Sequence, residues 1–193
     1  MIKITFPDGA VREYQQGITP MEVAKSISEG LARNVLAAMV DGVRTETSTP
    51  INADATLTLY TWNDKDGKEA FWHSSAHLLA EAVQSIFPKA KFGIGPAIEN
   101  GFYYDIDFGE YTISTEDLTK IEKKMKEIAS KKVNFERINV TKKDAIRFFK
   151  RKKDEYKLEL IEELEDGEIT FYRQNKFTDL CKGPHITSTR KIK

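Results

Sequence analysis

The stretch FWHSSAHLLA, residues 71–80, predicts both a main helix and part of a functional site. It holds His73 and His77, two of the three histidines of the chain, four positions apart. Apolar residues recur at helical spacing from this stretch up to Pro88, which predicts a helix. Residues four apart on a helix project from one face, so we expect both imidazoles to point into the same space.

A second motif, DLCKGPH at residues 179–185, pairs the third histidine with the only cysteine. Cys181 and His185 are again four positions apart. Gly183 and Pro184 lie between them and favour a loop or irregular turn over a helix. Every imidazole and the only thiol of the chain therefore fall into two pairs with the same spacing.

Four such side chains around one space would allow several kinds of chemistry. They form a tetrahedral nitrogen and sulfur set for zinc, structural if all four bind and catalytic if one position stays open. Without a metal, an imidazole orients or deprotonates a water, because its pKa lies near neutrality. Cys181 as a covalent nucleophile is a third reading, with no separate orienting group evident. Ordinary core residues are the fourth.

Composition limits the class of protein. The chain has 193 residues, enough for one large domain or two small ones, and 40% of them are hydrophobic. Lysine plus arginine and aspartate plus glutamate both number 30, so a nucleic-acid partner would need a local basic patch. One cysteine excludes a disulfide framework and predicts a cytoplasmic protein. The alternating N-terminus predicts neither a signal peptide nor a transmembrane helix.

Residues 1–62 predict a small β-grasp, ubiquitin-like module. Strands around Ile2–Phe6 and 11–14 flank a Pro-Asp-Gly turn and form a hairpin. Thr19 and Glu22 form a capping box for a helix that should stop at Gly30. Residues 35–40 and 56–60 predict further strands. The module has no histidine or cysteine, which favours a binding or packing role.

Polar residues 63–68 predict a domain boundary, and residues 63–193 a larger α+β domain with a sheet packed by helices. The glycine-rich segment 92–101 is either a hairpin loop or a place of close approach for a ligand. Residues 102–107, 133–140 and 168–173 alternate as strands. Helices should begin at Ser114, with a core stripe that includes Leu118, and at Thr141. The basic run 150–153 is either a phosphate contact or a solvated helix end.

Four ordered motifs resemble the N-terminal half of bacterial threonyl-tRNA synthetase over essentially the whole chain: HSSAHLLAEA (73–82), GIGPAIENGFYYDID (93–107), YKLELI (156–161) and DLCKGPH. Residues 1–62 resemble the TGS domain, and residues 63–193 resemble the editing domain. The resemblance implies hydrolysis of serine wrongly attached to threonine tRNA, with threonyl-tRNA spared. It also implies that the full-length protein attaches threonine to its tRNA with ATP.

The resemblance implies two catalytic residues, which position or activate water and assist proton transfer: His73 and Lys157. It implies five residues that bind the substrate: His77, Tyr104, Asp179, Cys181 and His185. Asp179 would pair with the α-ammonium of the substrate, and Tyr104 would line its adenosine or amino-acid side. Taken alone, Lys157 would be predicted to be an exposed lysine, and Asp179 could equally cap a turn.

The resemblance implies no metal, with zinc on His73, His77, Cys181 and His185 as the alternative, because related alanyl-type editing domains use the same two pairs with zinc. The expected partners are the acceptor end of threonine tRNA carrying serine and the missing catalytic and anticodon-binding domains, with no membrane. The chain lacks the ATP motifs of class II synthetases, so we expect a fragment that does not aminoacylate. The rival functions are a zinc-dependent hydrolase and a non-catalytic tRNA-binding module.

Overall fold

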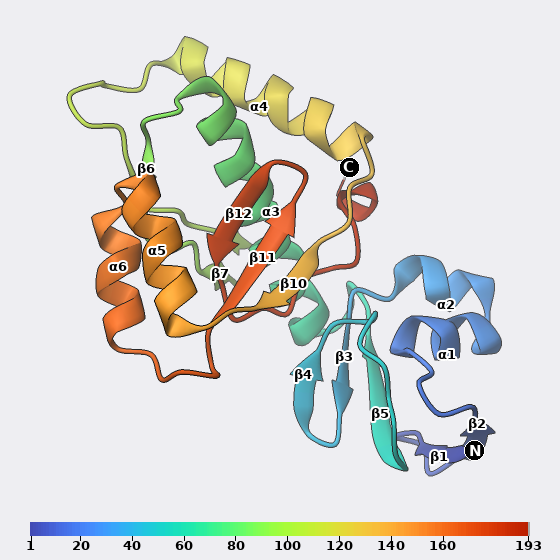
Figure 1. Ribbon diagram of the computed structural model, residues 1–193. Coiled ribbons are helices and arrows are strands. Elements are labelled where there is room, and N and C mark those ends of the chain that lie inside the picture. The colour runs from blue at the N-terminus through green and yellow to red at the C-terminus, as the bar shows by residue number, and fades with distance from the viewer. Residues whose placement is uncertain (193) are drawn as a thin grey trace. The chain divides into compact units, whose positions relative to one another are not determined.

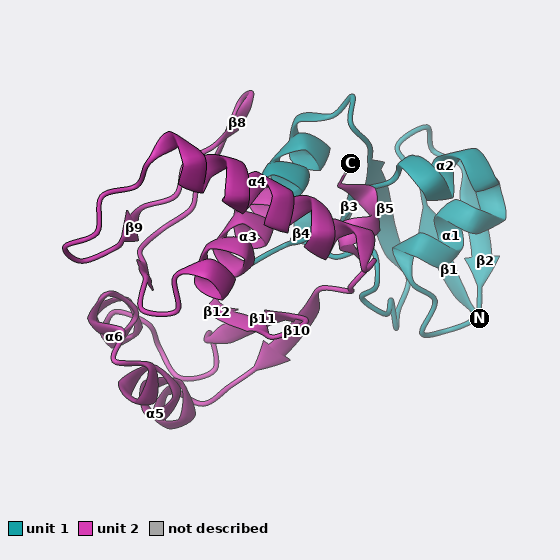
Figure 2. Cartoon of the chain, turned by 90° about the horizontal axis from the view of Figure 1, so that it is seen from above, with its two compact units in different colours: residues 1–72, 183–187 teal, residues 73–182, 188–193 magenta. Residues whose placement is uncertain are grey.

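The computed structural model describes residues 1–192 (Figure 1). Contacts between Cα atoms divide the chain into two compact units, which Figure 2 distinguishes by colour. The first unit holds residues 1–72 and 183–187, and the second holds residues 73–182 and those from 188 onward. The predicted domain boundary between residues 62 and 63 stays a prediction, and Lys193, the last residue of the second predicted domain, lies outside the described residues. Among residues 1–192, no helix is long and apolar enough to span a membrane.

The first unit is built on a five-stranded sheet in the order β2-β1-β5-β3-β4. The strands are β1 (Ile2–Thr5), β2 (Val11–Tyr14), β3 (Ala37–Val40), β4 (Val43–Thr45) and β5 (Ala55–Tyr60). Strand β1 pairs antiparallel with β2 and parallel with β5, so the sheet is mixed. Its core contains Ile4, Val23 and Leu57, all at most 1% exposed. The predicted β-grasp module is confirmed.

Helix α1 (Pro20–Ile27) begins where the sequence predicts. Thr19 and Glu22 form the predicted capping box, with Thr19 accepting from the backbone N–H of Glu22 at 3.2 Å. The predicted stop at Gly30 is wrong. The helix ends at Ile27, and Ser28 caps a second helix, α2 (Glu29–Asn34), that contains Gly30.

Helix α3 (Lys65–Ile86) carries the two histidines and begins earlier than the sequence suggests. Residues 65–68, part of the polar segment in which the sequence places a domain boundary, form its first turn. Gly67 explains this start, because a Cβ atom there would lie 1.9 Å from the carbonyl oxygen of Thr61. Only glycine lets the helix begin so close to the preceding backbone.

The second unit holds an antiparallel sheet in the order β10-β11-β12, formed by β10 (Glu136–Asn139), β11 (Thr170–Gln174) and β12 (Phe177–Leu180). Its further helices are α4 (Thr115–Ser130), α5 (Lys142–Lys152), α6 (Glu155–Glu162) and the short 3₁₀ helix η1 (Thr189–Lys191). One apolar cluster joins α3 to α4, and another joins α5 and α6 to β11. The predicted α+β class is confirmed.

Two sequence predictions about this unit are wrong in detail. Residues 102–107 are not one strand: β8 (Gly101–Phe102) pairs with β7 (Ala97–Ile98), and β9 (Ile106–Asp107) pairs with β6 (Lys91–Phe92). The glycine-rich segment between β6 and β7 packs on Tyr104, which lies between β8 and β9. A Cβ atom on Gly95 would lie 2.6 Å from the Tyr104 ring. Leu118 is 57% exposed, so the α4 core stripe begins at Ile121.

Candidate functional site

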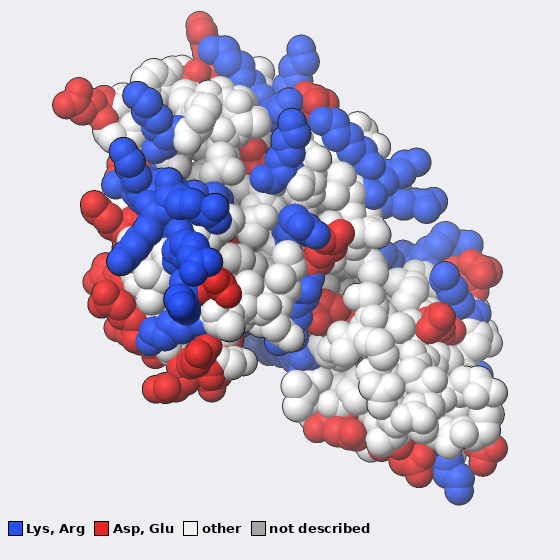
Figure 3. Space-filling model, in the orientation of Figure 1, with Lys and Arg blue, Asp and Glu red and all other residues white. Residues whose placement is uncertain are grey.

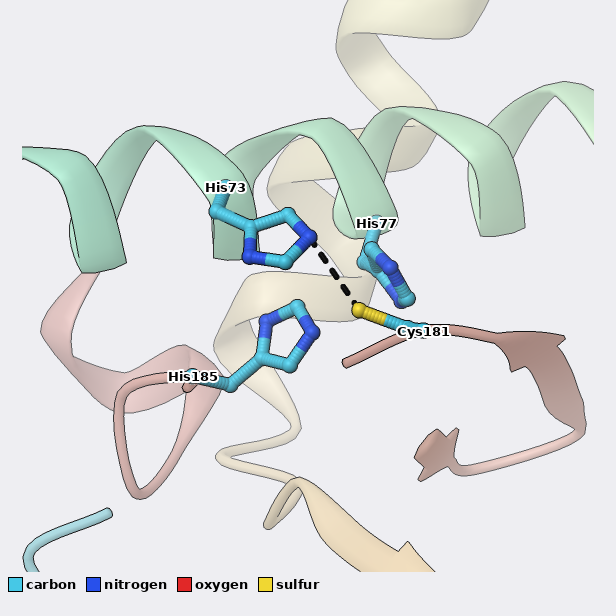
Figure 4. A group of neighbouring side chains, drawn as sticks. All are labelled: His73, His77, Cys181 and His185. Atoms are coloured by element: carbon cyan, nitrogen blue, oxygen red, sulfur yellow. Dashed lines mark hydrogen bonds between the residues drawn. The ribbon is translucent and has the colours of Figure 1, made fainter. Parts of the chain in front are cut away.

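Helix α3 presents His73 and His77 from one face, as the spacing predicts. Their ring centroids lie 5.4 Å apart, and Figure 4 shows both rings on the same side of the helix. His77 is 4% exposed, whereas His73 is half-buried. The more accessible imidazole is therefore His73, which the resemblance implies to be catalytic.

Strand β12 delivers Cys181 to this face. Its backbone N–H donates to the carbonyl oxygen of Thr170 at 3.1 Å, which continues the pairing of β11 and β12 by one residue. Its Sγ atom lies 3.2 Å from Nε2 of His73, within hydrogen-bonding distance for sulfur. Beyond Cys181 the chain runs as a loop to His185, as predicted.

The two sequence pairs supply one set of donor atoms. The candidate ligand atoms of His73, His77, Cys181 and His185 all lie within 4.8 Å of one another. Three imidazole nitrogens and one thiol sulfur are the donor types that tetrahedral zinc prefers. The set therefore fits a metal as well as metal-free proton transfer.

Burial sets the ionisation of His77. Desolvation, and next the charges of His73 and Lys157, hold the pKa of His77 well below its ordinary value. His77 is therefore neutral at neutral pH. The influence of Lys157 on His77 also means that the imidazoles and the ammonium share one electrostatic environment.

Lys157, Asp179 and Tyr104 form a buried polar network beside the histidines. The ammonium of Lys157 donates to Oδ2 of Asp179 and to the carbonyl oxygen of Gly93, both at 2.9 Å. The hydroxyl of Tyr104 donates to the same Asp179 oxygen at 3.1 Å. Desolvation, and next the charge of Asp179, raise the pKa of Tyr104 well above its ordinary value, so Tyr104 stays a donor.

The surroundings of Lys157 and Asp179 differ from what either residue alone suggests. Lys157 is 3% exposed, not solvated, and lies in the first turn of α6, where Asp154 accepts from its backbone N–H. Asp179 is 4% exposed and lies on strand β12, not at a turn. The resemblance found both residues, whereas composition and periodicity did not.

A pocket of about 780 Å³ adjoins this network. It is lined by the segment 93–94, by residues 104–107 and by one face of α6, with four carboxylates: Asp105, Asp107, Glu159 and Glu163. Tyr104 belongs to both the pocket and the network. The volume lies in the usual range for small-molecule sites.

Sequence reasoning missed two residues that hold the site together. The side-chain amide of Gln174 donates to the carbonyl oxygen of His77 and to Glu81, both at 3.0 Å. Asn175 donates to the other oxygen of Glu81 at 2.8 Å. These bonds fix α3 to the β11–β12 hairpin. A signal existed in the sequence, because Glu81 follows His77 by four positions and so lies on the same helix face.

Comparison with known families matches two segments of the chain. The model of the TGS domain matches residues 2–61, and that of the threonyl and alanyl tRNA synthetase second additional domain matches residues 169–193. The second match contains β11, β12 and the Cys181–His185 motif. It therefore covers the segment that brings the thiol to the α3 histidines.

Whole-chain relatives are more specific. Proteins described as threonine–tRNA ligases from Cytophaga hutchinsonii, Phocaeicola vulgatus and Bacteroides thetaiotaomicron are 59%, 58% and 55% identical over 193 residues. Each match covers 100% of this chain, which spans about 30% of the length of each relative. Over its whole length the chain is similar to the N-terminal regions of bacterial threonine–tRNA ligases, as the four motifs predict.

Proposed function

We propose that the predicted editing domain, residues 63–193, hydrolyses the ester between serine and threonine tRNA and spares threonyl-tRNA. One observation carries this proposal: a half-buried His73–Cys181 pair lies near a buried Lys157–Asp179–Tyr104 network, and Tyr104 of that network lines a pocket. Attachment of threonine to tRNA with ATP is proposed for the longer protein alone, because the chain spans about 30% of its relatives.

The chemical need for such a site follows from the two amino acids. Serine lacks one methyl group of threonine, and a single methyl or methylene in a pocket discriminates by roughly 1–3 kcal/mol. A synthetic site therefore attaches serine to threonine tRNA at an appreciable rate. A second site that excludes the larger threonine by steric contact removes the error.

The polar network has unused hydrogen-bonding positions that could bind a seryl ester. An ionised carboxylate offers about four lone-pair positions, and Asp179 uses three of them for Tyr104, Lys157 and the backbone N–H of Leu180. The remaining position suits the α-ammonium of serine as a charge-assisted bond. The pocket that Tyr104 lines would take the terminal adenosine.

Lys157 is also only partly used by the protein. An ammonium has three N–H donors, and among the described residues two of them reach Gly93 and Asp179. The third would donate to the ester oxygen as negative charge develops on it. Lys157 then stabilises the developing negative charge electrostatically and does not act as the base.

His73 is the group we assign to the proton. Water attacks the ester carbonyl carbon while Nε2 of His73 accepts its proton, and the bond from that carbon to the ribose oxygen then breaks. The proton returns to the leaving ribose oxygen, which frees serine and intact tRNA. Cys181 and His77 hold and shape this end of the site, with His185 beside them.

The four-residue donor set favours a second candidate, a zinc-dependent hydrolase of the same ester. The spread of 4.8 Å among the donor atoms is close to what zinc requires. His73, His77, Cys181 and His185 would hold the ion, which supplies a Lewis acid that lowers the pKa of a water. Elemental analysis of protein purified without chelators separates the two candidates. One zinc per chain, with activity lost to a chelator, supports the second.

The test is a deacylation assay with His73→Ala and Lys157→Met. We expect each variant to lose about 10²–10⁴-fold in hydrolysis of seryl-tRNA. Lys123→Met, an exposed lysine of α4, is the matched control and should keep full activity. Thermal unfolding of each variant shows whether lost activity reflects lost folding. Full activity in both folded variants would contradict the assignment.

A further inference from the structure

We propose that the outer face of α5 is a docking surface for the phosphate backbone of a nucleic acid, in the context of the proposed function the acceptor arm of tRNA. The α5 face is defined by four cationic side chains: Lys143, Arg147, Lys150 and Arg151. All four are exposed. Figure 3 shows lysine and arginine side chains gathered over this part of the molecule.

Helical geometry places these four side chains on one face. At about 100° per residue they fall within an arc of roughly 100°. The opposite face of α5 carries Ala145 and Phe149, which are buried in the second unit at 0% and 1% exposure. The face is therefore held rigidly by packing on one side and presents its charge on the other.

Helix α4 provides the comparison within the same unit. It has four lysines and four acidic residues. Three of these lysines bond to neighbouring carboxylates, such as Lys124 to Glu127 at 2.8 Å and Lys126 to Glu122 at 2.6 Å. From Lys142 to Lys153, by contrast, there are seven cationic side chains and one acidic one. Among residues 1–192, Arg147 pairs with Asp144, whereas Lys143, Lys150 and Arg151 have no ion pair.

The needs of the helix explain only part of this charge. Cations in the last turn favour the helix dipole, which accounts for Lys150 and Arg151. Lys143 lies in the first turn, where a cation is disfavoured, and Lys143, Arg147 and Arg151 repeat at four-residue spacing, where like charges repel. A self-repelling row suits a surface that meets an anionic partner.

Two cationic residues of α5 have other roles and are not part of the face. The ammonium of Lys142 donates to the carbonyl oxygens of Glu162 and Leu164 at the end of α6. That of Lys152 donates to the carbonyl oxygen of Thr178 and lies over the Phe148 ring. Thr178 immediately precedes Asp179, so Lys152 ties the end of α5 to the strand that carries the site.

The chemistry of the pocket favours a nucleic acid on this face. Four carboxylates line the pocket, which therefore disfavours phosphates and suits the terminal nucleoside and an ammonium. The phosphates that precede the nucleoside need a cationic surface elsewhere. No large exposed apolar side chain lies on α5 in the described part of the chain, so the face has no anchor for a lipid bilayer.

The experiment compares two variants that lose the same charge. The α5 variant carries Lys143→Gln, Arg147→Gln, Lys150→Gln and Arg151→Gln. The α4 variant carries Lys120→Gln, Lys123→Gln, Lys124→Gln and Lys126→Gln. Binding of a labelled threonine tRNA transcript to the 193-residue chain is measured by fluorescence anisotropy across a salt series, and thermal unfolding confirms that both variants fold.

We expect the α5 variant alone to bind more weakly, with the slope of log K against log salt reduced by roughly 3. Equal losses in both variants would mean that only net charge matters, and an unchanged α5 variant would mean that the face is merely solvated. Either result overturns the proposal, as does loss of binding to anionic phospholipid vesicles without loss of tRNA binding. The binding assay needs no hydrolysis. If the wild-type chain does not hydrolyse seryl-tRNA, the proposed function is rejected, but the binding data still test the α5 face.

Discussion

The interiors of the two units differ in kind. The first unit buries mainly apolar side chains, with Ile4, Val23 and Leu57 at 0–1% exposure. The second unit also buries an ion pair, Lys157 with Asp179, at 3% and 4% exposure. A buried ion pair is weak evidence for stability, because desolvation offsets its attraction, and apolar replacements are often as stable. On the proposed function, the buried ion pair serves hydrolysis, whereas the apolar core around the β-grasp sheet serves packing.

The strongest way to test this difference is to break and then remove the buried pair. Asp179→Leu should lower the free energy of unfolding by about 3–5 kcal/mol, because the ammonium of Lys157 stays buried with its carboxylate partner removed. Adding Lys157→Met should restore most of that loss. Denaturant unfolding measures both, and the double variant should remain unable to hydrolyse seryl-tRNA.

If the double variant is no more stable than the single one, the apolar replacements do not restore stability. The ion pair would then stabilise the fold itself, which contradicts the expectation above. If the double variant keeps hydrolysis, the network is not the chemical part of the unit. The stability role and the catalytic role are tested separately, because denaturant unfolding measures the first and deacylation measures the second.

The reciprocal change in the first unit is Leu57→Ala. A cavity in its apolar core should cost about 2–5 kcal/mol in unfolding free energy. Leu57 is 1% exposed and lies in the cluster of the β-grasp sheet. Hydrolysis per folded molecule should not change, which a deacylation assay corrected for the folded fraction would show. A specific loss of hydrolysis would contradict the division of roles.

The hydrogen bonds that join α3 to the β11–β12 hairpin should contribute an intermediate amount to stability and to hydrolysis. Gln174→Met removes the amide that donates to His77 and Glu81, and the loss of these buried hydrogen bonds should cost about 1–3 kcal/mol. We expect the hydrolysis rate constant to fall with little change in KM, because the His73–Cys181 contact loosens while the pocket stays. Asn175→Ala, which removes one bond to Glu81 alone, should have a smaller effect on both quantities.

The smallest effect is expected at the surface of α4. Ser114→Ala removes the helix cap and should cost about 1 kcal/mol. The cap also depends on pH, because hydrogen bonds from Tyr111, and next from Ser114, hold the pKa of Asp117 well below its usual range. A carboxyl group with a lowered folded pKa stabilises above its unfolded pKa and loses that effect as pH falls through the folded value.

The melting temperature of the wild type should therefore fall below about pH 4, and Asp117→Asn should flatten that part of the curve. Hydrolysis measured at pH 7 should be the same for Ser114→Ala as for the wild type. A cap variant with altered hydrolysis would show that α4 matters to the site beyond its packing.

Local sequence signals predicted local structure well. The Thr19 capping box and the His73–His77 helix face depend on residues within one or two turns, so the sequence contains all the necessary information. The irregular Cys181–His185 loop follows from Gly183 and Pro184 in the same way. The early start of α3 was missed because it depends on how closely the helix packs at Gly67 against the backbone of Thr61, which no residue pattern indicates.

The site shows the same limit. Spacing identified the four imidazole and thiol residues, and the family resemblance added Lys157, Tyr104 and Asp179. No pattern indicated that Lys157 would bond to Asp179, 22 residues away, or that Gln174 would reach His77, 97 residues away. Such partners are set by how strands and helices pack, and one sequence does not contain that information in readable form.

The most direct test of the central claim is the single-turnover hydrolysis of seryl- and threonyl-esters of the same tRNA by the wild-type chain. Hydrolysis of the seryl ester should be faster by at least the 10- to 200-fold that roughly one methyl group provides. Equal rates for the two esters, or no hydrolysis of either above the rate in buffer, would contradict the claim that the buried polar interior is an editing site.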